Sequence, residues 1–292
     1  MRDVPALPAV VVGVDGSRAA IRAALWAVDE AVSRDIPLRL VYAVDPGEDN
    51  DVHPDDAARR LATAEIAVRS AVVAVESTDE STDKPVKIEV EITQGRPTST
   101  LVQASRSAVM VCVGAVGLNH FQPGRVGSTA AALASSAHCP VAIIRGHDGP
   151  ARRHADGIIV ETDAGPRDGV VLEAAMEEAR LRKAQLTVIS CWQSQFTDIH
   201  DAGAVADGNR RVGAQLDRRL ARWTRRYPDL EVKSVVVHGS TLNYLAKNAD
   251  SAQLVVVGAH DCHHVDELVG PTGTAALRDT DSSMLIVNRR HL

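Results

Sequence analysis

Residues 9–17 read AVVVGVDGS, and this stretch decides the fold. An uncharged run of Ala and Val is typical of a strand buried on both faces of a parallel sheet. Asp15 and Gly16 then favour a turn, and Ser17 is a good residue to cap the start of a helix. The stretch therefore predicts a strand, a turn and a helix, which together begin an α/β unit.

The segment after Ser17 carries a narrow apolar stripe at helical spacing. Its members are Ala20, Ala23, Ala24, Ala27, Val28 and Ala31. Because these side chains are small, we expect the helix to lie close to the sheet.

Strand-like apolar runs alternate with helix-length segments along the whole chain, and the series occurs twice. The first five runs are residues 9–14, 38–44, 86–92, 109–114 and 141–144. The second five are residues 158–162, 186–192, 232–237, 254–258 and 284–287. The chain is therefore predicted to be an internal duplication of one α/β unit.

The two copies can be aligned residue by residue. Glu30-Ala31 matches Glu178-Ala179 at an offset of 148 residues (178 minus 30), and the same offset places Asp15 on Asp163. Later, Gly114 matches Gly258 at an offset of 144 (258 minus 114). We predict a first domain over 1–146, a linker rich in Gly, Pro and charge over 147–156, and a second domain over 157–292.

Each domain is expected to be a doubly wound, Rossmann-like five-stranded parallel sheet, covered by helices on both faces. If strands 1, 2 and 3 wind one way and strand 4 returns to the other side of strand 1, the strand order is 3-2-1-4-5. A ligand should then bind at the carboxyl ends of strands 1 and 4, where the winding direction changes.

Composition limits the partners of this 292-residue chain. A net charge of −6 gives no general attraction for nucleic acid or anionic lipid, so neither partner is expected. The N-terminus resembles neither a signal peptide nor a membrane span, which favours a cytoplasmic protein. Four widely spaced cysteines without a C-x-x-C pair are then expected to be thiols.

Two segments fall at the predicted ligand position. One is Asp15-Gly16-Ser17, and the other is GAVGLNHFQPGRVGST over 114–129. The second segment spaces its glycines so that backbone N–H groups can approach a phosphate, and a helix start adds partial positive charge. Asp15 can accept hydrogen bonds from ribose hydroxyls, and backbone groups near Ala43 can meet a base edge. The simpler alternative is that these glycines only make a tight connection between strand and helix.

With the flanking VVVGVDGS and HCPVAII, this spacing resembles the ATP-binding branch of the universal stress protein family, and both repeats are similar to the domain of that family. The resemblance implies ATP, with Mg²⁺ as a candidate companion ion. It also implies a cytoplasmic homodimer that regulates stress or dormancy through a protein partner still to be identified. The nucleotide-binding residues that it implies are Asp15, Ala43, Gly114, Gly117, Gly127 and Ser128.

Other nucleotide motifs are absent from the sequence. There is no G-x-x-x-x-G-K-[ST], no dinucleotide-type G-x-G-x-x-G and no kinase signature set. No catalytic residue is predicted, and the chain is expected not to be an enzyme beyond slow ATP hydrolysis. A slow ATPase or phosphotransferase and a scaffold that needs no nucleotide remain the alternatives.

The second copy departs from the glycine pattern. Asp261 stands where Gly117 stands, Pro271 replaces Ser128, and Glu161 replaces Gly13, so this repeat is expected not to bind ATP. Its loop also contains His260, Cys262 and His264, which are zinc-ligand types. A polar surface loop is the favoured interpretation, and no metal site is assigned.

The last strand of each copy, residues 141–144 and 284–287, is apolar and lies at a sheet edge. Because unpaired apolar edges promote aggregation, we expect these two strands to pair with each other.

Overall fold

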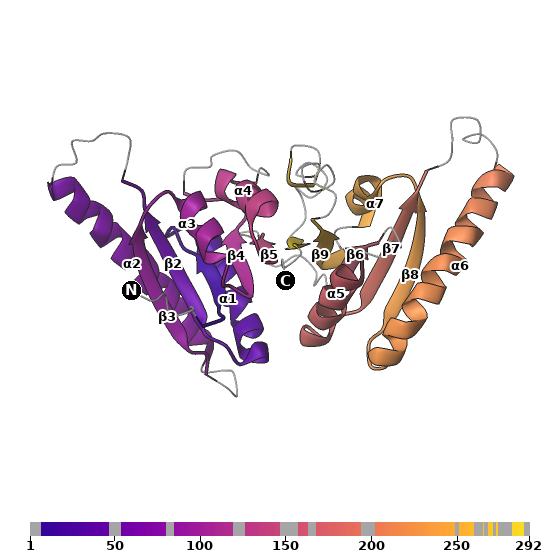
Figure 1. Ribbon diagram of the computed structural model, residues 1–292, viewed down its shortest axis with the longest axis horizontal. Coiled ribbons are helices and arrows are strands. Elements are labelled where there is room, and N and C mark those ends of the chain that lie inside the picture. The colour runs from indigo at the N-terminus through magenta and orange to yellow at the C-terminus, as the bar shows by residue number, and fades with distance from the viewer. Residues whose placement is uncertain are drawn as a thin grey trace. The chain divides into compact units, whose positions relative to one another are not determined.

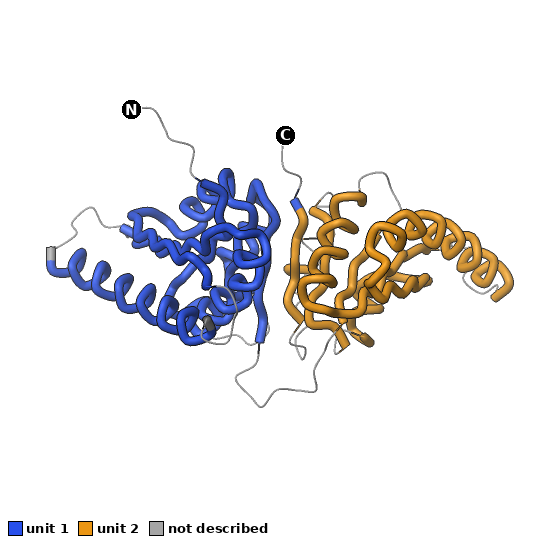
Figure 2. The backbone as a smooth tube through the Cα atoms, turned by 90° about the horizontal axis from the view of Figure 1, so that it is seen from below, with its two compact units in different colours: residues 1–146, 288–292 blue, residues 147–287 orange. Residues whose placement is uncertain are grey.

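The computed structural model describes residues 7–46, 54–79, 85–118, 126–146, 157–162, 168–193, 202–248, 251–259, 265, 268–270, 273 and 282–288. It divides into two compact units, residues 1–146 with 288–292 and residues 147–287 (Figure 2). Each unit contains parallel strands covered by helices (Figure 1). The α/β fold class predicted from the sequence is confirmed.

The first unit follows the predicted alternation of strands and helices. Its elements are β1 (Val10–Gly13), α1 (Arg18–Arg34), β2 (Leu38–Val44), α2 (Pro54–Asp79), β3 (Ile88–Gln94), α3 (Pro97–Ala104), β4 (Met110–Gly114), α4 (Ser128–Ser136) and β5 (Val141–Ile144). The strand order is β3-β2-β1-β4-β5, and all four neighbouring pairs are parallel. The predicted order 3-2-1-4-5 is confirmed. Helices α1 and α2 contact each other over one face, and α3 and α4 contact each other over the opposite face.

Helix α1 lies close to the sheet for the reason that its sequence predicts. The Ser17 side chain accepts a hydrogen bond from the Ala20 N–H at 3.1 Å and caps the helix. The predicted stripe of small residues is buried. At the end of β4 the approach is so close that a Cβ on Gly114 would lie 2.7 Å from the Ala19 carbonyl carbon. Gly114 is therefore required for packing as well as available to a ligand.

The second unit repeats this topology. Its elements are β6 (Gly157–Glu161), α5 (Gly169–Leu181), β7 (Leu186–Trp192), α6 (Ala202–Arg226), β8 (Val232–His238), α7 (Thr241–Asn248), β9 (Ala252–Gly258) and β10 (Ser283–Val287). The strand order is β8-β7-β6-β9-β10, again wholly parallel.

Residues that are 148 apart in the sequence have the same local structure in the two units. Just after the first helix of each copy, a residue adopts positive φ at the matching position, Asp35 (55°) and Lys183 (51°). Glu30 and Glu178 are both buried, and each pairs with an arginine four residues later. The expected pairing of β5 with β10 would join the two units and stays a prediction.

Three of the four cysteines lie in the described part of the chain. Cys112, Cys139 and Cys191 are free thiols, the first two buried. Among the described helices, none combines the length and the apolar character needed to cross a membrane.

Gly114→Ala should destabilise the protein by about 1 to 3 kcal/mol, because the new methyl group meets the Ala19 backbone. The matched control is Gly213→Ala in α6. Its Cβ would make ordinary contact with Val236 at 3.5 Å, and the higher helix propensity of Ala should stabilise by up to about 1 kcal/mol. Urea unfolding of both variants would measure the difference. Equal midpoints would contradict the close packing of α1 on β4.

Candidate functional site

A cleft of about 700 Å³ opens at the carboxyl ends of β1, β2 and β4. This volume falls in the usual range for small-molecule sites. The cleft brings together all six residues predicted from the sequence, namely Asp15, Ala43, Gly114, Gly117, Gly127 and Ser128. They come from three segments of the chain, around Asp15, around Ala43 and within residues 114–129, so their meeting depends on the strand order.

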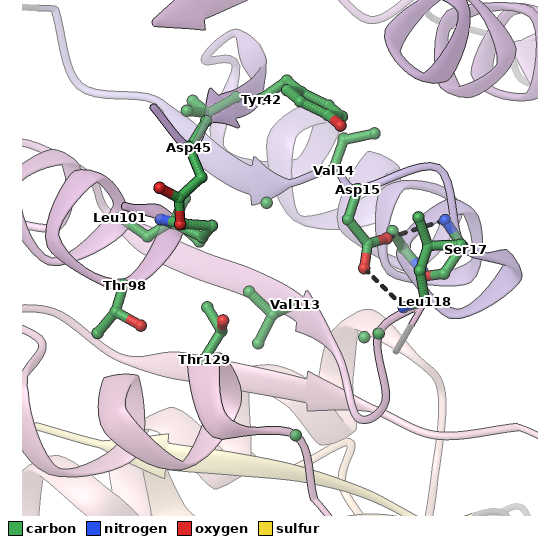
Figure 3. A pocket seen from close by; sticks show the side chains of 18 of the residues that line it. Val14, Asp15, Ser17, Tyr42, Asp45, Thr98, Leu101, Val113, Leu118 and Thr129 are labelled. Carbon is green, nitrogen blue, oxygen red and sulfur yellow. Dashed lines mark hydrogen bonds between the residues drawn. The ribbon is translucent and has the colours of Figure 1, made fainter. Parts of the chain in front are cut away.

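Asp15 joins the two loops that form the cleft (Figure 3). Its Oδ1 accepts a hydrogen bond from the Ser17 N–H at 2.9 Å, at the start of α1. Its Oδ2 accepts one from the Leu118 N–H at 3.3 Å, in the loop after β4. The carboxylate predicted from the sequence to meet a ribose therefore also holds the β4 loop against the start of α1.

Gly117 lies beside this carboxylate. A Cβ at this position would be 2.8 Å from the Asp15 Oδ2, so any side chain would push the Asp15 carboxylate or the loop away. Gly127 has a different role in the loop. Its N–H donates to the Ala115 carbonyl at 2.7 Å, and an added Cβ would meet only ordinary contacts, the nearest at 3.5 Å. Gly127 therefore closes the loop from the inside with its own N–H.

The start of α4 supplies donors that point out of the helix. The first intrahelical bond runs from the Ala131 N–H to the Gly127 carbonyl. The N–H groups of Ser128, Thr129 and Ala130 precede it, and all three residues line the cleft. Unpaired N–H groups and the partial positive charge of a helix start favour an anion such as phosphate.

Main-chain groups of β2 line the other side of the cleft. The Val41 carbonyl accepts a hydrogen bond from the Val14 N–H, so Val41 turns its backbone groups toward β1. Because the direction repeats every second residue, Ala43 faces the same side, where β1 has already ended at Gly13. The N–H and carbonyl of Ala43 are thus directed into the cleft and can meet the polar edge of a base.

Tyr42 adds an aromatic side chain to the cleft lining. Burial raises the pKa of its hydroxyl above the usual value, and the nearby Asp15 carboxylate raises it further. Tyr42 is therefore neutral at physiological pH, since a Tyr with a raised pKa keeps its proton there.

Several other lining residues were not predicted from the sequence. They are Arg60 from α2 and Arg96, Thr98 and Leu101 around α3. Arg60 donates to the main-chain carbonyls of Asp45 at 2.9 Å and Pro46 at 2.5 Å, which ties α2 to the end of β2. No sequence motif marks these residues, because packing of the helices brings them to the cleft.

In the second repeat, most of the corresponding loop falls outside the described residues. This applies to Asp163, Asp261 and Pro271, and to the candidate metal ligands His260, Cys262 and His264. Among the residues that the structure does describe, no group of three or more potential ligands is placed to hold a metal. The predictions made for that loop remain predictions.

Comparison with known proteins identifies the chain. The model of the universal stress protein family matches it twice, over residues 8–145 and 155–288. The chain belongs to the universal stress protein family. Two universal stress proteins of Mycobacterium tuberculosis (strain ATCC 25618 / H37Rv) are similar over nearly their whole length. One is 52% identical over 285 residues, covering 98% of both chains, and the other is 45% identical over 265 residues, covering 91% and 93%.

A solved structure with the same fold is the crystal structure of a universal stress protein from Archaeoglobus fulgidus DSM 4304. It matches with a TM-score of 0.69 over 96% of both chains, at 17% identity. The tandem arrangement of two universal stress protein domains in one chain is therefore established for this protein.

Asp15→Ala should free the β4 loop of this universal stress protein even without a ligand. Losing a hydrogen bond worth about 1 kcal/mol should speed exchange of the Leu118 amide by about fivefold. Asp15→Asn keeps a side-chain oxygen and should have a smaller effect. The amide of Val111, which donates to the Pro140 carbonyl, is the internal control. NMR hydrogen exchange without nucleotide measures both, and equal Leu118 rates in wild type and Asp15→Ala would contradict the role given to Asp15.

Proposed function

We propose that the first repeat binds ATP and that nucleotide occupancy is the signal this universal stress protein delivers. The strongest support is that main-chain hydrogen-bonding groups line the cleft from two opposite sides. Ala43 presents a peptide edge on one side, and the start of α4 presents N–H groups on the other. A ligand with a flat polar base at one end and phosphates at the other matches both sets.

The residues present fit an adenine nucleotide. The Ala43 main chain would contact the base, and the N–H groups of Ser128, Thr129 and Ala130 would contact the phosphates. Asp15 would accept from the ribose hydroxyls through the lone pairs that its two backbone donors leave free. Gly117 has no side chain that would displace this carboxylate. Mg²⁺ bound to the phosphates would neutralise part of their charge.

Binding, rather than turnover, is the proposed activity. Both oxygens of Asp15 accept hydrogen bonds from the protein, and Arg60 donates to two carbonyl groups. These contacts fix the two side chains in structural roles instead of leaving them to activate water or stabilise a leaving phosphate. We therefore expect hydrolysis to be slow at most, and steady ADP release well above a buffer control would favour the ATPase alternative.

Signalling then follows from the position of the β4 loop. Leu118 in this loop is exposed while its N–H contacts Asp15, so a change at the cleft can reach the surface. We propose that a nucleotide bound beside Asp15 orders this loop and that a protein partner recognises the ordered form, in a homodimer within the cytoplasm. Stress response is the role of the family to which the chain belongs.

Calorimetric titration of the full chain with ATP should give close to one site per chain. Gly117→Glu should weaken binding by about a hundredfold or more, because its side chain starts 2.8 Å from Asp15 Oδ2 and adds a second negative charge near the phosphates. Asp15→Ala should weaken binding by about tenfold through loss of the ribose contact.

The matched control is Asp163→Ala, which makes the same change at the corresponding position of the second repeat. It should leave the affinity and the number of sites unchanged. Two sites of similar affinity, or undiminished binding by Gly117→Glu, would overturn the proposal. A chain that never binds ATP would favour the nucleotide-independent scaffold.

A further inference from the structure

The two repeats differ in polarity at residues that line the base and ribose side of the cleft. At the offsets established from the sequence, five cleft positions of the first repeat carry polar side chains in the second. Gly13, Val14, Ala20, Ala43 and Pro97 correspond to Glu161, Thr162, Asp168, Cys191 and Thr241. None of the five first-repeat residues has a polar side-chain atom, whereas all five second-repeat residues have one.

These polar side chains bond to one another. Thr241 donates its hydroxyl to the Glu161 carboxylate, and the Cys191 Sγ lies 3.1 Å from the same hydroxyl oxygen. Separately, Thr162 donates to the Asp168 carboxylate. Thr162, Asp168 and Thr241 are buried, at 1%, 1% and 2% exposure. Hydrogen-bonded polar side chains therefore occupy positions that correspond to the lining of the first-repeat cleft.

We propose that the second repeat is closed to nucleotides by its own side chains and that Glu161 is the residue that decides it. This inference rests on the proposed function, because it assigns the single ATP site to the repeat that lacks a side chain at this position. Glu161 ends β6 as Gly13 ends β1, and its carboxylate reaches Thr241 at the start of α7. It thereby places a carboxylate at a position where the first repeat has no side chain.

The fold can accommodate a side chain at the Gly13/Glu161 position. Access of a nucleotide to the second repeat is therefore blocked by the Glu161 side chain and not by a different backbone path. In the first repeat, a Cβ on Gly13 would lie 2.7 Å from the Leu101 Cδ1, which is the end of a flexible side chain. The corresponding residue in the second repeat is Leu245, which is fully buried while Glu161 is present. A leucine at this site therefore packs beside a glutamate without loss of the fold.

Closure also predicts which ligand an opened second repeat would accept. Glu161→Gly with Cys191→Ala restores the first-repeat residues where a base and ribose are proposed to bind. The sequence of the phosphate loop, with Asp261 and Pro271, stays unfavourable. The opened repeat should therefore bind adenosine better than ATP.

The test exchanges the residues in both directions. Gly13→Glu should weaken ATP binding to the full chain by about a hundredfold or more, because a carboxylate occupies the cleft and repels phosphate. The matched control Gly13→Ala adds only a methyl group, which Leu101 and Val113 must accommodate at 2.7 and 3.1 Å, and should lose much less affinity. Circular dichroism melting identifies any variant that fails to fold.

A second measurement needs no nucleotide. In Glu161→Gly, Cys191 should react with iodoacetamide about tenfold faster than in wild type, because opening the cleft exposes the thiol and removes a carboxylate that raises its pKa. Glu161→Gln keeps the side-chain volume and should react less than Glu161→Gly. Peptide mass spectrometry separates Cys191 from the buried Cys112 and Cys139.

The outcomes separate the two proposals. Full ATP binding by a folded Gly13→Glu, or an unchanged Cys191 rate in Glu161→Gly, would overturn the closure by Glu161. Absence of ATP binding in wild type would overturn the proposed function, and the Cys191 rates would still decide whether Glu161 closes the second repeat.

Discussion

The early end of β1 is the constraint on which the site depends. β1 stops at Gly13 while β2 on one side continues to Val44. Beyond this end, the backbone groups of Ala43 have lost the neighbour that would pair with them in a sheet. Main-chain groups that lack a partner in the sheet bond to water or to a ligand, so the end of β2 offers bonding groups to a ligand. The cleft at this edge is therefore a direct result of placing strand 4 on the other side of strand 1.

Close packing around β4 then determines which groups of the protein reach the cleft. Helix α1 approaches the end of β4 so closely that only glycine fits at position 114, and Gly117 leaves only enough room for the Asp15 carboxylate. The loop after β4 thus follows a path fixed by contacts within the protein, and it delivers the start of α4 to the cleft already oriented. Preorganised donors bind anions more tightly than mobile ones, because less freedom is lost on binding.

Much of this arrangement could be predicted from the sequence, because it depends on interactions between residues close together in the chain. The run of valines before Asp15, the cap at Ser17 and the alanine stripe each act within a few residues, so the strand, turn and helix were predictable. The duplication indicated that both units share one strand order, and each unit shows the expected order. Strand ends were less certain, since β3 covers Ile88–Gln94 rather than the predicted 86–92. This edge strand alternates weakly, and Val90 is 52% exposed, so periodicity alone did not locate it.

The residues that were missed share a physical cause. Arg60 and Thr98 reach the cleft from helices whose positions depend on packing, and no local pattern reports such distant contacts. From the sequence, the weakness of the second repeat was expected in its phosphate loop and at Glu161, which replaces Gly13. The structure adds the bond between Glu161 and Thr241 on the base side. That bond joins residues 80 apart in the chain and could not be inferred from either segment alone.

The first repeat is proposed to present accessible main-chain groups to a nucleotide, and the second repeat is proposed not to. Backbone NMR of the full-length chain during addition of ATP tests this difference most directly, because it reports on both repeats in one sample. We expect amide shift changes at Ala43, Gly117 and Ser128. We expect no change at Cys191, which corresponds to Ala43, or at Thr241, which corresponds to the cleft residue Pro97. Changes of equal size in both repeats, or none in the first, would contradict it.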